Sequence, residues 1–153
     1  MVGIHMDHRW VLKFSKKGLS GIYWNPEATE PNPIQDHLIN INHETKNQLI
    51  EYFEGKRKIF SIPIDLQGTR FQLKVWNELI KIPYGTTTTY LEIAKRIGNP
   101  KAVRAVGTAI GKNPICIIIP CHRVISSDGS IGGYSGGVDN KKKLIYLEST
   151  VEG

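Results

Sequence analysis

Cysteine and long apolar runs are scarce in this chain of 153 residues, and each shortage excludes a class of protein. The two cysteines, Cys116 and Cys121, are too few for a disulfide framework. Their spacing suits neither a CxxC metal site nor a CxxC redox motif. No apolar run approaches the roughly 18 residues of a membrane span, and the N-terminus has no apolar signal segment. We therefore expect a reduced, cytoplasmic protein without a membrane span.

Negative charge is also in short supply. The chain carries 20 Lys and Arg residues against 14 Asp and Glu residues, a formal net charge of +6, and its sequence pI is about 9.3. This excess favours a polyanionic partner, although many proteins with the same charge never bind nucleic acid. The basic run at residues 141–143 (KKK) is interpreted as a solvated helix face.

The first 65 residues read as a small α/β domain with antiparallel strands. Residues 9–14 alternate apolar and polar side chains and are followed by a second apolar stretch at 19–24, a pattern typical of a β-hairpin. Beyond a proline-rich loop, Asn42 is predicted to cap a helix that ends at Gly55. Residues 58–64 are predicted to form another strand. No catalytic constellation is visible in this part.

Residues 66–153 read as a second, mainly helical domain, so the fold class is α/β of the α+β kind. Two capping boxes predict helices that begin after Thr69 and Thr89. Asn99, followed by Pro100, is predicted to cap a third helix. The short turn between the second and third helices indicates a winged-helix-like helix-turn-helix, although any αα-hairpin would give the same pattern.

One side of the third helix carries the side chains expected to face a partner. Lys101, Arg104 and Thr108 share this side at positions i, i+3 and i+7. The helix is otherwise rich in small residues, namely Ala105, Gly107 and Ala109. Little side-chain bulk allows the helix backbone to approach a nucleic-acid groove closely. The alternative is that the small residues serve helix packing and Arg104 is merely solvated.

The most informative segment is ICIIIPCHRV at residues 115–124. Its apolar half predicts a buried strand that delivers Cys121, His122 and Arg123 to the edge of the core. A cysteine is a strong nucleophile when neighbouring positive charge or a base activates it, and His122 and Arg123 offer both kinds of help. Because adjacent residues do not face each other on a helix or strand, we expect either an irregular turn, which Pro120 would help to set, or a water that bridges Cys121 and His122. The alternative is that Cys121 is a small core residue.

The string PCHR at residues 120–123, with NP at 113–114 and GGYS at 132–135, resembles the O6-alkylguanine-DNA alkyltransferases, also called methylated-DNA–protein-cysteine methyltransferases. Further matching motifs follow in order: IPYG at 82–85, TY at 89–90 and AVRAVG at 102–107. The resemblance covers more than half of the chain, from about residue 71 to residue 148, and is weak before residue 65.

The resemblance implies a DNA-repair protein that moves the alkyl group of O6-alkylguanine, or of O4-alkylthymine, irreversibly onto Cys121 in a single turnover. By resemblance, His122 takes the thiol proton through a water and is oriented by Glu148, while Tyr90 donates a proton toward N3 of the departing base. The implied partner is double-stranded DNA. The third helix would enter the minor groove, the damaged base would flip out, and Arg104 would fill the vacancy.

The resemblance also assigns supporting residues. The DNA-binding set is Lys101, Arg104, Ala105 and Thr108. The substrate pocket and its support comprise Asn113, Arg123, Val124, Tyr134 and Ser135. Asn113 would tie the helix-turn-helix to the cysteine segment, and the glycine-rich stretch 129–137 would recognise the base through backbone amides. Some relatives bind zinc through N-terminal cysteines, which this chain lacks, so we expect no metal, no cofactor and a monomer.

Three alternatives stay open on the sequence. A lesion-binding alkyltransferase-like protein would recognise alkylguanine without repairing it, but such proteins lack the reactive cysteine. A Cys-His hydrolase with Glu148 as the orienting carboxylate would turn over an ester or amide repeatedly. A plain helix-turn-helix regulator would leave Cys121 inert in the core, and thiol reactivity would distinguish it.

Overall fold

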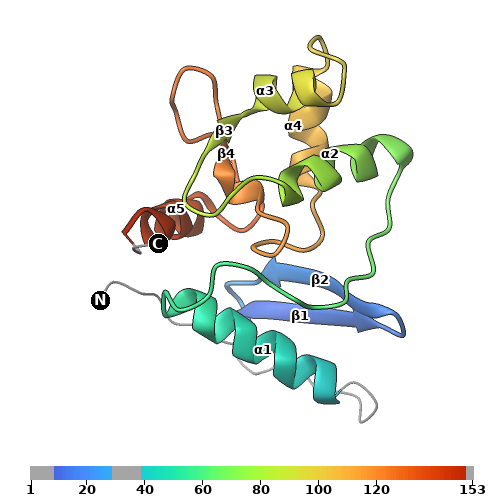
Figure 1. The fold of residues 1–153 in the computed structure, drawn as a ribbon, viewed down its shortest axis with the longest axis vertical. Helices are drawn as coiled ribbons and strands as arrows, with labels where there is room; N and C mark the ends of the chain where they lie inside the picture. Colours follow the sequence, from blue (N-terminus) through green and yellow to red (C-terminus); the bar gives the residue numbers. More distant parts are fainter. Residues whose placement is uncertain (1–8, 29–38, 151–153) are drawn as a thin grey trace.

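The computed structural model describes residues 9–28 and 39–150. Strands β1 (Trp10–Ser15) and β2 (Gly18–Trp24) form the expected antiparallel hairpin, with Trp10 opposite Trp24. Helix α1 (Ile39–Phe53) lies on one side of the hairpin and the helices of the second domain lie on the other (Figure 1). Burial explains this arrangement, because Trp10 packs against Phe53 of α1 with ring centroids 6.4 Å apart.

Two predictions for the first domain are wrong. Helix α1 already includes Asn42 as a buried interior residue, so Asn42 is not its cap. Residues 58–64 do not form a strand and make only an isolated bridge between Ile64 and Leu19. Pro63 has no N–H to donate to a ladder, although its carbonyl accepts from the N–H of Leu19 (2.9 Å). The segment instead crosses the hairpin as the link to the second domain.

Both predicted capping residues begin helices in the second domain. Thr69 forms a full capping box with Gln72 ahead of α2 (Arg70–Ile80). The Thr89 hydroxyl accepts from the N–H of Glu92 (3.1 Å) at the start of α3 (Tyr90–Arg96). Local hydrogen bonding is enough to specify these helix starts.

The third helix, α4 (Val103–Gly111), begins later than predicted. Asn99 does not cap it, because residues 99–102 close a separate turn in which the N–H of Ala102 donates to the Asn99 carbonyl (3.0 Å). Lys101 therefore lies in this turn and not on the helix. Ala109 is buried, and its carbonyl accepts from the indole N–H of Trp76 (2.8 Å) in α2. Ala109 thus serves packing between helices.

Residues 115–119 do not form the predicted strand. They fold into a tight turn in which Cys116 bridges Ile119, and Ile117 has a φ of 76°. The turn rests on the hairpin, because the N–H of Cys116 donates to the carbonyl of Ile22 (3.2 Å). A run of buried apolar residues does not distinguish a strand from a buried turn. The chain continues through the 3₁₀ turn η2 (Cys121–Arg123), β4 (Val124–Ile125) and α5 (Val138–Thr150).

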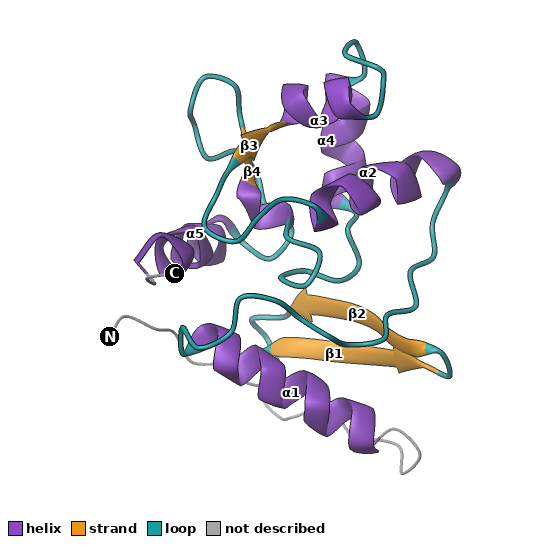
Figure 2. Ribbon diagram, in the orientation of Figure 1, coloured by secondary structure: helices purple, strands orange, loops and turns teal. Residues whose placement is uncertain are grey.

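Two short strands bring the chemistry-bearing segments together. Strand β3 (Thr88–Thr89) pairs in parallel with β4, so that Thr88 lies opposite Val124 (Figure 2). Tyr90 follows β3 directly and Cys121 lies just ahead of β4. Within the part of the chain that the structure describes, no helix is both long and apolar enough to cross a membrane.

Candidate active site

A cavity of about 250 Å³ opens beside Cys121. Its lining joins α3, α4, η2 and the glycine-rich stretch 129–137, and comprises Tyr90, Gly107, Ile110, Gly111, Cys121, Gly133, Tyr134 and Ser135. Four of these residues belong to the predicted site: Tyr90, Cys121, Tyr134 and Ser135. Gly107 and Gly111 come from the proposed DNA-facing helix, so the cavity lies at the edge of that helix.

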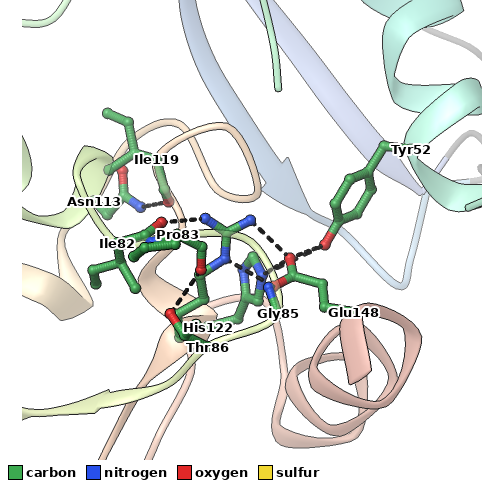
Figure 3. A network of polar contacts seen from close by, with 10 residues as sticks. Tyr52, Ile82, Pro83, Gly85, Thr86, Asn113, Ile119, His122 and Glu148 are labelled. Atoms are coloured by element: carbon green, nitrogen blue, oxygen red, sulfur yellow. Dashed lines mark hydrogen bonds and ion pairs between the residues drawn. The ribbon is translucent and has the colours of Figure 1, made fainter. Parts of the chain in front are cut away.

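The carboxylate of Glu148 is contacted by donors from three segments of the chain (Figure 3). Its Oε2 accepts from the Tyr52 hydroxyl (2.6 Å), and the same oxygen lies 2.6 Å from His122 Nε2. Arg123 donates to both carboxylate oxygens (2.8 and 3.0 Å), and the N–H of Gly85 donates to Oε1 (3.2 Å). Burial opposes ionisation of Glu148, but the hydrogen bonds from His122 and Arg123 outweigh it and lower its pKa to about 2.

His122 is held as a neutral base. Its burial lowers the pKa of the ring, against the opposing influence of the Glu148 carboxylate. Because Nε2 faces a carboxylate, the single proton of the neutral imidazole belongs on Nε2. Nδ1 then carries the lone pair, and this buried atom has no hydrogen-bond partner within the described residues. The ring therefore has a free basic nitrogen next to the cysteine in the chain.

Cys121 is a thiol at rest. Contact with the neighbouring Cys116 thiol and burial raise its pKa well above the ordinary value. The expected positive charges do not activate it, because His122 is neutral and Arg123 is paired with Glu148. A buried thiol of this kind requires a base to take its proton when it reacts. The neutral His122 fits that requirement.

Asn113 holds the cysteine segment in place. Its side-chain amide donates to the carbonyl of Ile119 (2.8 Å), and its side-chain oxygen accepts from the N–H of Ile115 (3.0 Å). Both ends of the turn that precedes Cys121 are thus tied to the residue two positions after α4. The side chain of Asn113 thus joins the end of α4 to the segment that carries Cys121.

Lys141 corrects the interpretation of the basic run. It is fully buried, and its ammonium donates to the carbonyls of Ile131 (2.5 Å) and Gly133 (3.0 Å), whereas Lys142 and Lys143 are exposed. Burial lowers the pKa of Lys141 to about 8. The ammonium therefore holds the glycine-rich stretch against the cavity.

The same stretch approaches Tyr90 closely. Gly132 has a φ of +74°, and a Cβ on it would lie 2.9 Å from the Tyr90 hydroxyl. The neighbouring Gly133 has no atom within 4 Å of a built Cβ, so the cavity is open at this position. Burial raises the pKa of Tyr90, which keeps its hydroxyl protonated as a donor.

The predicted DNA-binding residues form a separate group from the cavity. Arg104, Ala105 and Thr108 are exposed on α4, and Lys101 is exposed in the preceding turn. The residues proposed for chemistry thus line the cavity, and those proposed for DNA contact lie on the surface. Gly107 and Gly111 of α4 line the cavity as well. Val124 is buried in β4, where it supports the pairing with β3.

Sequence reasoning missed two residues at this site. Tyr52 comes from the first domain and lies 96 positions from Glu148, so no local pattern signals their contact. Lys141 had a usable signal, because Leu144 and Glu148 follow it at i+3 and i+7 and share its buried face. Among the described residues, no group of three or more His, Cys, Asp or Glu side chains is placed to hold a metal.

Comparison with known proteins assigns the chain to a class: DNA-repair methyltransferases that use their own cysteine. Two family profiles match in sequence, the 6-O-methylguanine DNA methyltransferase ribonuclease-like domain at residues 14–66 and its DNA binding domain at residues 70–150. The chain belongs to the methylated-DNA–protein-cysteine methyltransferase family.

Relatives and solved structures agree with this assignment. A methylated-DNA–protein-cysteine methyltransferase of Methanosarcina mazei is 56% identical over 140 residues, which cover 90% of this chain and 89% of that protein. The inducible enzyme of Bacillus subtilis is 54% identical over 101 residues, covering 66% of this chain and 56% of that protein. The crystal structure of Mycobacterium tuberculosis OGT in complex with DNA has a TM-score of 0.80 and 42% identity, covering 91% of this chain and 85% of that chain.

Proposed function

We propose that Cys121 is the residue that accepts the alkyl group from O6-alkylguanine in duplex DNA, once per protein molecule. The observation that carries this proposal is the position of Cys121, which lines a cavity of about 250 Å³ together with Tyr90. The neutral His122 behind it, oriented by Glu148, supplies a base. The other free thiol, Cys116, does not line this cavity.

The transfer step follows from these groups. The sulfur of Cys121 attacks the alkyl carbon, a C–S bond forms, and the bond from that carbon to O6 of guanine breaks. The thiol proton passes through a water to Nδ1 of His122, the buried nitrogen that lacks a protein partner. Tyr90 donates a proton toward N3 of the departing guanine, which avoids expelling an anion. The thioether that results is stable, so the reaction ends there.

DNA binding is proposed for the exposed side of α4 and the turn ahead of it. Arg104, Ala105 and Thr108 lie on this side, and the helix contributes Gly107 and Gly111 to the cavity. A base flipped from the minor groove at this helix would therefore reach Cys121 without crossing the core. Arg104 is a long, exposed side chain on this helix and would occupy the vacated stack. Few base-specific contacts are needed, because the minor groove carries little sequence information.

The substitution Cys121→Ser separates binding from chemistry. An alcohol is a far weaker nucleophile than a thiol near neutral pH, while the exposed side of α4 is unchanged. We expect the variant to bind alkylated duplex with parental affinity and to transfer no alkyl group. Repair by the serine variant at the parental rate would show that Cys121 is not the acceptor.

The substitution Arg104→Ala tests the DNA-binding part independently. We expect a small loss of duplex affinity, a larger loss of repair rate on duplex DNA, and an unchanged reaction with free O6-alkylguanine base, which needs no flipping. The matched control is Lys143→Ala, which removes an exposed positive charge from α5. If Arg104→Ala repaired duplex at the rate of the control, Arg104 would be an ordinary solvated residue.

A further inference from the structure

The second cysteine of the chain lies beside the first. Cys116 and Cys121 are both free and buried, with 2% and 3% of their surfaces exposed. The turn between them is closed by backbone hydrogen bonds, from the N–H of Ile119 to the Ile115 carbonyl (3.0 Å) and from the N–H of Cys121 to the Ile119 carbonyl (2.8 Å). The thiols of Cys116 and Cys121 lie within hydrogen-bonding reach of each other, and the transfer step uses only one of them.

Ser135 contacts Cys116 and shares a cavity with Cys121. Its hydroxyl lies 3.6 Å from the sulfur of Cys116, and the residue also lines the cavity of Cys121. Cys116 opens on its other side to a separate cavity of about 300 Å³, next to the hairpin. Contact with Cys121 and with Ser135 lowers the pKa of Cys116 to about 7, against the opposing effect of burial. Cys116 is therefore a nucleophile poised against its neighbour.

We propose that Cys116 and Cys121 form a reversible disulfide when a small hydroperoxide, such as hydrogen peroxide, enters the site. In the first step His122 takes the proton of Cys121, a sulfur–oxygen bond forms at Cys121 and the O–O bond of the peroxide breaks. The released hydroxide takes up that proton, so the products are a sulfenic acid and one water. In the second step the Cys116 thiolate attacks the Cys121 sulfur, and the hydroxyl leaves as a second water. Two thiols lose two electrons and two protons, and the peroxide is reduced.

The disulfide would have two consequences. It removes the thiol that the proposed function uses, so an oxidised molecule accepts no alkyl group until a reductant restores it. It also diverts the sulfenic acid of Cys121 before a second peroxide converts it to an irreversible sulfinic acid. The loss of repair rests on the proposed function of Cys121, whereas formation of the disulfide does not.

The test uses the whole protein, treated with hydrogen peroxide under non-reducing conditions and then quenched with catalase. Trypsin cleaves after Lys112 and Arg123, so both cysteines fall within one peptide, residues 113–123. We expect this peptide to lose the mass of two hydrogen atoms and to become inert to iodoacetamide. Acceptor capacity on methylated duplex should fall in parallel and return after treatment with dithiothreitol.

The matched variants are Cys116→Ser and Cys116→Ala, which leave Cys121 in place. Under the same treatment both should gain oxygen on Cys121, and dithiothreitol should restore progressively less of their acceptor capacity as exposure lengthens. Two outcomes would overturn the proposal: a parental peptide that gains oxygen without losing two hydrogens, or a parental protein that inactivates and recovers exactly as the variants do. If the disulfide forms but acceptor capacity survives, the proposed role of Cys121 fails and the disulfide stands.

Discussion

Replacement of Glu148 by Gln removes the charge around which the inner site is organised. Tyr52, Arg123 and Gly85 direct O–H or N–H donors at the carboxylate, and His122 does so through Nε2. Glutamine has nearly the same shape, but its amide nitrogen is a donor and would face donors in either orientation. The buried guanidinium of Arg123 would also lose its counter-charge. The variant therefore perturbs electrostatics with little change of volume.

The expected loss of stability is large. Removing one partner of a buried ion pair lowers the free energy of unfolding by about 3–5 kcal/mol, because the remaining charge stays uncompensated in the interior. A domain of this size has roughly 5–15 kcal/mol of stability in total, so the variant would be folded but markedly weakened. Alkyl transfer should slow by roughly 10²-fold or more, because His122 loses the group that orients it as a base.

Acid provides an independent check on the same carboxylate. Its pKa is about 2 in the folded protein against an ordinary value of 4.5. A carboxyl whose folded pKa is depressed stabilises the protein above its unfolded pKa, and this contribution is lost as pH falls toward the folded pKa. The difference of 2.5 units corresponds to about 3 kcal/mol. The extra unfolding free energy that the parent has over Glu148→Gln should therefore disappear as the pH falls from 5 to 2.

Urea unfolding of both proteins, followed by tryptophan fluorescence at pH 7 and at acid pH, measures the two effects. The control is Glu51→Gln, which disrupts a half-exposed pair with Arg57 at 3.0 Å and should cost no more than about 1 kcal/mol. Equal losses for Glu148→Gln and Glu51→Gln at pH 7, with parental repair rates for both, would refute the reasoning. If the difference in unfolding free energy between the parent and Glu148→Gln stayed constant on acidification, the depressed pKa assigned to Glu148 would be refuted.

Two further substitutions probe residues that sequence patterns do not reveal. Tyr52→Phe deletes a 2.6 Å hydrogen bond to Glu148 and should cost about 1.5–3 kcal/mol in urea unfolding, with slower alkyl transfer and unchanged duplex affinity. Parental stability and rate would show that the first domain plays no part in the site. Lys141→Met keeps the buried stem but frees the carbonyls of Ile131 and Gly133, so reaction with free alkylated base and with duplex should slow to the same degree. A defect on duplex alone would place Lys141 in DNA binding instead.

Local chemistry made part of the fold predictable from sequence. The capping pattern after Thr69 depends on hydrogen bonds within one helical turn, and the structure has the same pattern. Alternating side chains at residues 9–14 predict the hairpin for a similar reason, because burial of one face specifies the pairing. The motif around Cys121 identified the family without reference to the fold.

Features that depend on distant contacts were not predictable. The buried run at residues 115–119 meets β2 only at an isolated bridge between Ile115 and Ile22 and folds as a turn against the hairpin, which composition alone does not reveal. Asn99 resembles a helix cap but closes a separate turn, because the helix starts only at Val103. The contact of Tyr52 with Glu148 joins two domains, and the positive charge of Arg123 is directed to that same carboxylate and not to Cys121.

The stoichiometry and position of alkylation test the central claim most directly. The protein is incubated with an excess of duplex that contains O6-methylguanine. Its intact mass is measured over time, and peptide mapping then locates the modification. We predict that each molecule gains one methyl group and then stops, and that fragmentation of peptide 113–123 places the group on Cys121 and not on Cys116. Product formation well beyond one equivalent, or a methyl group located on Cys116, would contradict the account.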